Sequence, residues 1–273
     1  MIKDITLGQF FPGNTPLHKM DPRMKIILTV VYIVAIFLAK NLWSFIAVLA
    51  SAVFLVLVSK ISFKTILKSM KPLIFVLAFT TFFNLFWTTG DVLLISFWKI
   101  NIYLEGIVFS VMMILRITSL LVGTTVLLTY TTSPIMLTDG LERLLAPLRV
   151  IKLPVHEFSM MMTIALRFIP TLVEETDKIM SAQKARGADF ESGSLMRRAK
   201  ALVPILIPLF ISAFRRADDL ATAMECRCYR GGDGRTKMTQ LKFALCDFAG
   251  FFLMAAFVVG IVLLNLVPCA ISM

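Results

Sequence analysis

The chain has 273 residues, of which 58% are hydrophobic and only 16% are charged, whereas soluble domains carry roughly 25% charged residues. It holds 28 lysines and arginines against 17 acidic residues, which gives a formal net charge of +11. The long apolar runs and a mean hydropathy of +0.84 exclude an ordinary cytosolic enzyme and a disordered chain.

Five apolar runs are long enough, or nearly long enough, to cross a bilayer core of about 30 Å. In chain order they cover approximately residues 24–39, 42–58, 73–88, 106–131 and 243–267. Asp21 followed by Pro22 is an N-cap residue before proline, a pair that predicts the start of the first helix. The predicted fold class is all-α, a polytopic membrane protein with about five transmembrane helices and room for more.

The cations are distributed unevenly between the two sides of the membrane. If the N-terminus is cytoplasmic, 25 of the 28 lysines and arginines fall on the inside, and only Lys40 and Lys99 fall outside. The positive-inside rule therefore predicts a multi-pass protein with a cytoplasmic N-terminus and an external C-terminus. Arg116 lies inside the fourth run, where a functional role, a pairing with a carboxylate and snorkelling to the surface are all open.

These features divide the chain into three regions. Residues 1–132 form an N-terminal transmembrane region of about four helices, residues 133–242 a cytoplasmic or interfacial region, and residues 243–273 a C-terminal transmembrane helix. The middle region contains two short apolar pieces, around residues 158–169 and 201–214. We favour long amphipathic helices at the cytoplasmic surface, interrupted at Arg167 and Pro170. The alternative is that the two apolar pieces cross the membrane as an extra helical hairpin. The distribution of lysine and arginine does not distinguish this alternative from the amphipathic helices.

A diverged repeat with an offset of 41 residues lies in the middle region. Residues 177–187 read DKIMSAQKARG and residues 218–228 read DDLATAMECRC. Both segments share the leading aspartate, an aliphatic residue two positions later, Ser or Thr before Ala, and an arginine nine positions after the aspartate. Each closes an amphipathic pattern with helical spacing, which predicts two long helices that lie on a surface.

Each copy of the repeat ends in an arginine near a helix C-terminus, Arg186 in the first and Arg227 in the second. Gly187 occupies the position of a left-handed C-cap. One interpretation is that the two arginines only offset the negative end of the helix dipole. The other is that each guanidinium binds an acidic groove on another protein, so that one chain holds two copies of a partner or two related partners.

The sequence contains only weak signals for a metal-binding, nucleotide-binding or catalytic site. Cys226 and Cys228 form a Cys-x-Cys pair without a second ligand pair, and the G-x-x-x-x-G-K-[ST] loop for ATP is missing. His18 and His156 are interpreted as interface or capping residues, and the glycine-rich residues 231–235 as a linker. We therefore predict no metal and no cofactor bound by the chain. We also expect no nucleic acid, because residues 133–242 carry 17 cations against 12 acids and few aromatic residues for base stacking.

A rival interpretation is an integral membrane enzyme that acts on lipid at the cytoplasmic interface. Its nearest candidate acids are Glu174, Glu175 and Asp177. Their spacing spreads the three carboxylates around a helix, which disfavours a shared active site.

Two parts of the chain together resemble a known family. Near the N-terminus these are the Pro-Gly pair at 12–13 and LHKMDPRMK at 17–25; in the middle region they are Ala185-Arg186-Gly187 and ADDLATAMECRCYRGG at 217–232. The pattern is similar to the T component of energy-coupling-factor transporters, a prokaryotic branch of the ABC transporters for vitamins and trace metals. The resemblance covers essentially the whole chain. Cys228 departs from the family pattern, which has glycine there, so the second helix ends either at Cys228 or at Gly231 or Gly232.

The resemblance implies a membrane scaffold in the cell membrane, with two coupling helices that dock into two cytoplasmic ABC ATPase subunits, A and A′. A separate membrane protein, the S component, would select the cargo, and ATP and magnesium would be bound by the ATPases alone. The residues implied to dock with the ATPases are Ala185, Arg186, Gly187, Cys226, Arg227 and Cys228. The residues implied to contact the other coupling helix or the S component are Ile179, Met180, Leu220 and Met224.

Overall fold

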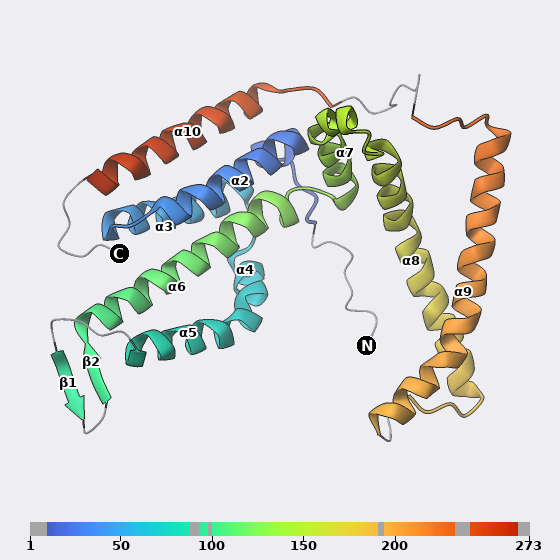
Figure 1. Cartoon of the computed structure of the whole chain (residues 1–273), viewed down its shortest axis with the longest axis horizontal. Coiled ribbons are helices and arrows are strands. Elements are labelled where there is room, and N and C mark those ends of the chain that lie inside the picture. Colours follow the sequence, from blue (N-terminus) through green and yellow to red (C-terminus); the bar gives the residue numbers. More distant parts are fainter. Residues whose placement is uncertain (1–9, 88–92, 98–99, 191–193, 233–240, 267–273) are drawn as a thin grey trace. The chain divides into compact units, whose positions relative to one another are not determined.

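The computed structural model describes residues 10–87, 93–97, 100–190, 194–232 and 241–266 (Figure 1). Its contacts divide the chain into two compact units. One, here called the bundle unit, comprises residues 8–140 and 241–273, and the other, the arm unit, is built mainly from residues 141–240.

Helices make up almost all of the bundle unit. Its elements are α1 (Pro16–Lys19), α2 (Pro22–Leu38), α3 (Leu42–Ser59), α4 (Phe63–Met70), the 3-10 turn η2 (Lys71–Leu73), α5 (Ile74–Trp87), β1 (Leu93–Phe97), β2 (Ile100–Tyr103), α6 (Leu104–Thr124), its π-helical continuation η3 (Thr125–Tyr130), and α10 (Leu245–Leu266). Within the described residues, four stretches are long and apolar enough to cross a membrane: residues 42–59, 63–87, 104–130 and 245–266. Helix α2 is apolar, but its 17 residues are marginal for a span.

The predicted all-α membrane fold is therefore confirmed, with one small exception. Strands β1 and β2 form an antiparallel hairpin between α5 and α6, with Phe97 opposite Ile100 and an irregularity in register between Leu93 and Ile95. No strand was predicted here, because five residues of alternating pattern are a weak signal beside the apolar runs.

The core of the bundle unit lies where α2, α3 and α6 meet. Tyr32, Phe45 and Met112 are almost completely buried there. Tyr32 packs on the backbone of α6 at Gly123, where an added Cβ would lie 2.1 Å from the Tyr32 ring. Glycine at position 123 thus permits the close approach of the two helices.

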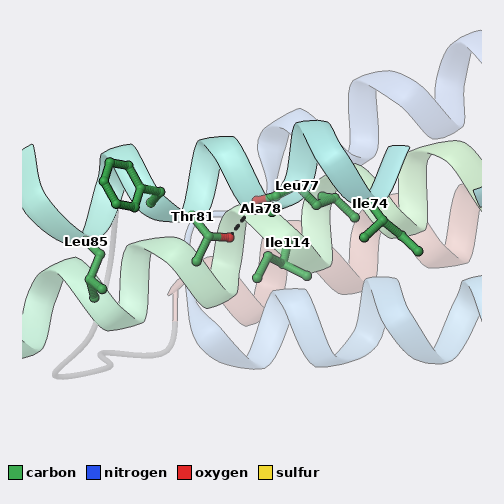
Figure 2. Close-up of a pocket in the computed structure, with 7 residues that line it drawn as sticks. Ile74, Leu77, Ala78, Thr81, Leu85 and Ile114 are labelled. Carbon is green, nitrogen blue, oxygen red and sulfur yellow. Dashed lines mark hydrogen bonds between the residues drawn. The ribbon is translucent and has the colours of Figure 1, made fainter. Parts of the chain in front are cut away.

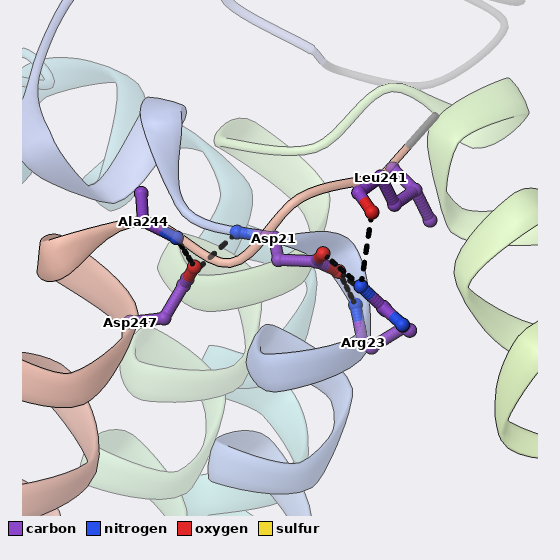
Figure 3. A network of polar contacts seen from close by, with 5 residues as sticks. All are labelled: Asp21, Arg23, Leu241, Ala244 and Asp247. Atoms are coloured by element: carbon purple, nitrogen blue, oxygen red, sulfur yellow. Dashed lines mark hydrogen bonds and ion pairs between the residues drawn. The ribbon is translucent and has the colours of Figure 1, made fainter. Parts of the chain in front are cut away.

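Helices α2 and α10 are joined at both ends by polar contacts. At the first end, the Asp247 carboxylate accepts hydrogen bonds from the backbone N–H of Asp21 at 2.8 Å and of Ala244 at 2.7 Å (Figure 3). At the other end, the Asn265 amide donates to the Leu38 carbonyl at 2.7 Å. The two helices therefore run parallel, and their ends are satisfied where lipid offers no hydrogen-bond partner.

Arg116 has a structural role at the turn between α2 and α3. Its guanidinium donates to the carbonyl of Ala39, the C-cap of α2, at 3.1 Å, and lies 5.1 Å from the centre of the Phe45 ring. A cation at a helix C-terminus is stabilised by the helix dipole, and the ring face adds a cation–π contact. Of the roles left open by the sequence, the structure favours a pairing, which includes the Ala39 carbonyl.

Two residues of the N-terminal motif at 17–25, His18 and Lys25, form hydrogen bonds with other parts of the chain. The His18 ring donates from Nε2 to the Phe11 carbonyl at 2.9 Å and accepts from the Thr15 hydroxyl at 2.6 Å. Lys25 is buried, and its ammonium donates to the Thr131 carbonyl at 2.8 Å. The His18 ring thus holds a local turn through Phe11 and Thr15.

The arm unit contains two long helices. Its elements are the end of α7 (Pro134–Leu144), the 3-10 turn η4 (Ala146–Ile151), α8 (Val155–Ala185) and α9 (Leu195–Cys226). The predicted interruption at Arg167 and Pro170 is wrong, because α8 continues through both residues for 31 residues. Each internal proline removes only one backbone hydrogen bond, so the turns on either side keep the helix continuous.

The apolar piece predicted at 201–214 is likewise part of a longer helix. It lies inside α9, which has 32 residues and includes Pro204 and Pro208. In the described part of the chain, neither α8 nor α9 has a stretch apolar enough to qualify as a membrane span. This favours amphipathic helices over the alternative of an extra transmembrane hairpin.

Candidate functional site

Helices α8 and α9 contact each other at matching positions of the repeat. Arg216 of α9 donates from Nη2 to the Glu175 carboxylate of α8 at 3.0 Å, and both side chains are only partly exposed. A hydrogen bond from Ser212 lowers the pKa of Glu175 below its ordinary value, and the charge of Arg216 acts in the same direction. The 41-residue offset that relates the two repeats also separates Glu175 from Arg216.

The two helices end in the same backbone geometry. Arg186 is the C-cap of α8 with φ −87° and ψ 8°, and Arg227 is the C-cap of α9 with φ −91° and ψ 13°. The next residue is left-handed in both cases, with φ +86° at Gly187 and φ +57° at Cys228. The second arm therefore ends at Cys228 and not at Gly231 or Gly232.

The hydrogen bonds at the two ends also correspond pair by pair. After Arg186, the N–H of Ala188 donates to the Gln183 carbonyl at 3.0 Å and the N–H of Gly187 to the Lys184 carbonyl at 3.0 Å. After Arg227, the N–H of Tyr229 donates to the Met224 carbonyl at 3.0 Å and that of Cys228 to the Glu225 carbonyl at 2.8 Å. Both ends are Schellman motifs, which hold the preceding arginine in a defined place.

The residues predicted to dock are exposed at these two ends. They are Ala185, Arg186, Gly187, Cys226, Arg227 and Cys228. Among the described residues, neither the Arg186 nor the Arg227 guanidinium has an ion pair or a side-chain hydrogen bond. A Cβ added to Gly187 would meet nothing within 4 Å, so glycine is needed there for its backbone conformation alone.

The two arginines lie at equal distances from the crossing of the helices. Arg186 follows Glu175 by 11 residues, and Arg227 follows Arg216 by 11 residues. At 1.5 Å per residue, each guanidinium stands about 16 Å along its helix from the crossing. The C-terminal ends of α8 and α9 lie at opposite ends of the pair (Figure 1). The arm unit thus has two helical segments of equal length beyond the crossing, and each ends in an exposed arginine.

The residues predicted to contact the other arm or a membrane partner lie between the crossing and the tips. Ile179 and Met180 on α8, and Leu220 and Met224 on α9, are all half-buried.

A second apolar surface on α9 was missed by the sequence analysis. Before the crossing, an exposed stripe follows the helical period through Val203, Leu206, Phe210 and Phe214, with exposed fractions of 46 to 67%. The pattern was present in the sequence, but the two prolines led to its treatment as a separate short piece. An apolar stripe of this kind marks a surface for lipid or for another protein.

The acids of the rival enzyme do not form a shared site. Glu175 is held by Arg216 at the crossing, while Glu174 is exposed. His156 pairs with Glu142 at 3.0 Å, and no group of three potential metal ligands occurs among the described residues. The predicted linker at 231–235 lies mostly outside the described residues.

The bundle unit has an open apolar groove of about 480 Å³ between α5 and α6 (Figure 2). It is lined by Ile74, Leu77, Ala78, Thr81, Phe82, Leu85 and Ile114. The Thr81 hydroxyl is the polar group drawn there, and it donates to the Leu77 carbonyl at 2.7 Å. Since ligand sites need convergent polar groups as well as apolar walls, the groove has little to orient a polar ligand.

Comparison with known proteins agrees with these features. A family model described as "CbiQ: Cobalt transport protein" matches residues 13–238. Three similar relatives are each named "Energy-coupling factor transporter transmembrane protein EcfT". The one from Ruminiclostridium cellulolyticum is 52% identical over 98% of this chain and 99% of its own length. Those from Clostridium kluyveri and Listeria innocua are 54% and 46% identical over 91% and 90% of this chain, and 92% and 93% of their own lengths.

Proposed function

Because the chain belongs to the family of energy-coupling factor transporter transmembrane proteins, we propose that it couples ATP hydrolysis by cytoplasmic partners to uptake of a vitamin or trace metal. The chain is a membrane-embedded transport component, as its four apolar helical stretches also indicate. In the proposed complex, two ATPase subunits bind ATP and magnesium, and a membrane S component carries the cargo. The chain itself performs no chemical step.

The two exposed arginines are the proposed docking points for the ATPases. The observation that carries this proposal is the equivalence of the two tips, which share one backbone geometry and one distance from the crossing. Two related ATPase subunits would offer two related acidic grooves, and a guanidinium binds a carboxylate bidentately. Ala185 and Cys226 are small residues beside each arginine, and they allow the partner surface to approach closely.

Motion would pass along the arms as rigid-body rotation. A continuous helix of about 46 Å, such as α8, transmits a displacement at its tip to the rest of its length. The contact of Glu175 with Arg216 would make the two arms move as a pair. The half-buried residues Ile179, Met180, Leu220 and Met224 are proposed to contact the other arm or the S component.

The orientation proposed for the chain places the arms and the N-terminus in the cytoplasm. The excess of lysine and arginine in residues 133–242 supports this orientation, since such residues are retained on the cytoplasmic side. The ATPases, which need cytoplasmic ATP, would then meet the tips on the same side of the membrane.

Charge reversal at the tips tests the proposal. We expect the double variant Arg186→Glu, Arg227→Glu to insert normally but to lose copurification of the ATPases and substrate uptake. The matched control is Arg167→Glu with Arg215→Glu, which reverses two exposed arginines of the same helices that lie between the helix ends. Retained ATPase binding in the tip variant would refute the docking role.

A further inference from the structure

A cluster of four lysines surrounds the short helix α4 in the bundle unit. Lys60 is the left-handed C-cap of α3, Lys64 and Lys68 lie on α4, and Lys71 begins the turn that follows. All four are exposed, and among the described residues none of their ammonium groups has an ion pair or a hydrogen bond to a side chain. The sequence has no aspartate or glutamate between residues 59 and 90. The segment therefore carries four positive charges close together in the sequence, with no acidic residue beside them.

Helix α4 is also amphipathic, and its exposed surface carries apolar side chains beside the lysines. Ile66 is 3% exposed and faces the core of the bundle unit, whereas Phe63 and Leu67 are 67% and 53% exposed. Lys64 and Lys68, four residues apart, share the face beside these two apolar side chains, because successive residues turn by about 100°. The surface of α4 thus presents an apolar sector next to a lysine sector, which is the pattern of a helix at a membrane interface.

The position of α4 in the chain keeps it close to the bilayer. It follows α3 and forms the first part of the stretch 63–87, and both α3 and this stretch are long and apolar enough to span a membrane. Only residues 60–62 precede it, and the three-residue turn η2, which contains Pro72, follows it. In Figure 1, α4 runs in a different direction from α5, as expected of a helix that lies along the membrane surface next to a spanning helix.

The end of the bundle at which α4 lies follows from the hydrogen bonds of α10. The start of α3 is at the Asn265 end of α10, where Ser44 donates to Asn265 at 2.7 Å. Helix α3 has 18 residues and runs from there toward the Asp247 end, where α2 begins. Helix α4, which follows α3, lies at the level of the Asp247 end, the end that carries the N-terminus of α2.

We propose that Lys60, Lys64, Lys68 and Lys71 form a binding site for the headgroups of anionic phospholipids. The ammonium groups would contact lipid phosphates, while Phe63 and Leu67 insert among the upper acyl carbons. An acidic protein surface would satisfy the charges but would leave the adjacent apolar sector in water. The site anchors the bundle unit to the inner leaflet, and it does not depend on how the arms dock.

Lipid selectivity of the full chain tests this site. The chain is reconstituted in phosphatidylcholine that contains a trace of spin-labelled phosphatidylglycerol or spin-labelled phosphatidylcholine, and the bound fraction of each is measured. We expect a several-fold preference for the anionic lipid that weakens as salt is raised. The variant with all four lysines changed to glutamine should lose the preference, and the variant with all four changed to arginine should keep it. Helix content by circular dichroism shows whether each variant is folded.

Three results would overturn the proposal. One is a preference for phosphatidylglycerol that persists in the glutamine variant, and another is a wild-type preference that does not respond to salt. The third is loss of ATPase copurification in the glutamine variant with unchanged lipid selectivity, which would assign the lysines to an acidic protein surface. The wild-type salt series remains decisive even if the glutamine variant fails to fold.

Discussion

Glu175 and Arg216 each lie two residues before one copy of the repeat, at equivalent positions 41 residues apart, and they pair with each other at 3.0 Å. The two arms are thus related by an approximate two-fold arrangement, in which a position meets its own counterpart. With identical residues, such a self-contact would bring like charges together. Here one copy has a glutamate and the other an arginine, so the contact at the crossing is attractive.

This relationship predicts the behaviour of a charge swap. Glu175→Arg alone and Arg216→Glu alone each place like charges at the crossing, whereas the double variant restores an opposite pair. Spin labels at Ala182→Cys and Ala223→Cys, two exposed and equivalent positions, report the distance between the arms. In a chain whose own cysteines are replaced by serine, we expect the distribution to broaden in each single variant and to narrow again in the double variant. A double variant as broad as the singles would exclude a direct pairing.

The same pair predicts a pH dependence. Because the pKa of Glu175 is lowered in the folded chain, the pairing stabilises the crossing above the ordinary glutamate range and through neutral pH. It is lost only as the pH falls through that lowered pKa and the carboxyl group is protonated. The spin-label distribution should therefore stay narrow from neutral to mildly acidic pH and broaden only below the pH range in which an ordinary glutamate titrates. Broadening near neutral pH would contradict the assigned direction.

Two substitutions at the left-handed cap positions should have opposite effects, because one removes a glycine and the other introduces one. Gly187→Ala should weaken the first tip by about 1 kcal/mol, because a residue with a Cβ is strained at φ +86° although nothing blocks the side chain. Cys228→Gly should relieve the corresponding strain at the second tip. The gain in stability is partly offset, because glycine raises the conformational entropy of the unfolded chain. Amide hydrogen exchange should become faster at Ala188 in the first variant and slower at Tyr229 in the second. Equal exchange in wild type and both variants would show that the left-handed caps are not strained.

Asp247 should be critical for the association of α2 with α10. Asp247→Ala leaves the N–H groups of Asp21 and Ala244 without their acceptor, at a cost of about 2 kcal/mol or more. Asp247→Asn, which keeps one acceptor oxygen, should have an intermediate effect. The yield of folded protein in a detergent series measures this loss, and Glu157→Ala, at an exposed position, is the control. A wild-type yield for Asp247→Ala would remove the proposed role.

Arg116 is predicted to act on stability and not on transport. Arg116→Met removes the hydrogen bond to the Ala39 carbonyl and the contact with the Phe45 ring, which should cost about 1 to 3 kcal/mol. Uptake should then fall only in proportion to the amount of folded transporter. A variant that is fully folded but inactive would instead place Arg116 on a transport path, as intramembrane cations often are.

The apolar helices were predictable from the sequence because one strong signal dominates them. The runs predicted at 42–58 and 243–267 agree closely with α3 (Leu42–Ser59) and α10 (Leu245–Leu266). The continuity of α8 and α9 was not predictable from Pro170, Pro204 and Pro208, since a single proline interrupts a helix in some contexts and is absorbed in others.

The candidate site was only partly predictable for a different reason. The repeat and its two arginines are local patterns, so the sequence reveals them. The crossing of Glu175 with Arg216 joins residues on two helices, and their opposite charges hide the equivalence of the two positions. The cap at Cys228 was left open because a left-handed cysteine is uncommon, and backbone hydrogen bonds to Met224 and Glu225 decide it.

Photo-crosslinking from the two tips tests the central claim most directly. A photoreactive residue at Ala185 or at Cys226, each next to a tip arginine, should crosslink the assembled complex to an ATPase subunit. The same residue at Phe210, which is exposed on α9 between its two ends, should not. Crosslinks from both tips to lipid acyl chains, or none to an ATPase from either tip, would contradict the account.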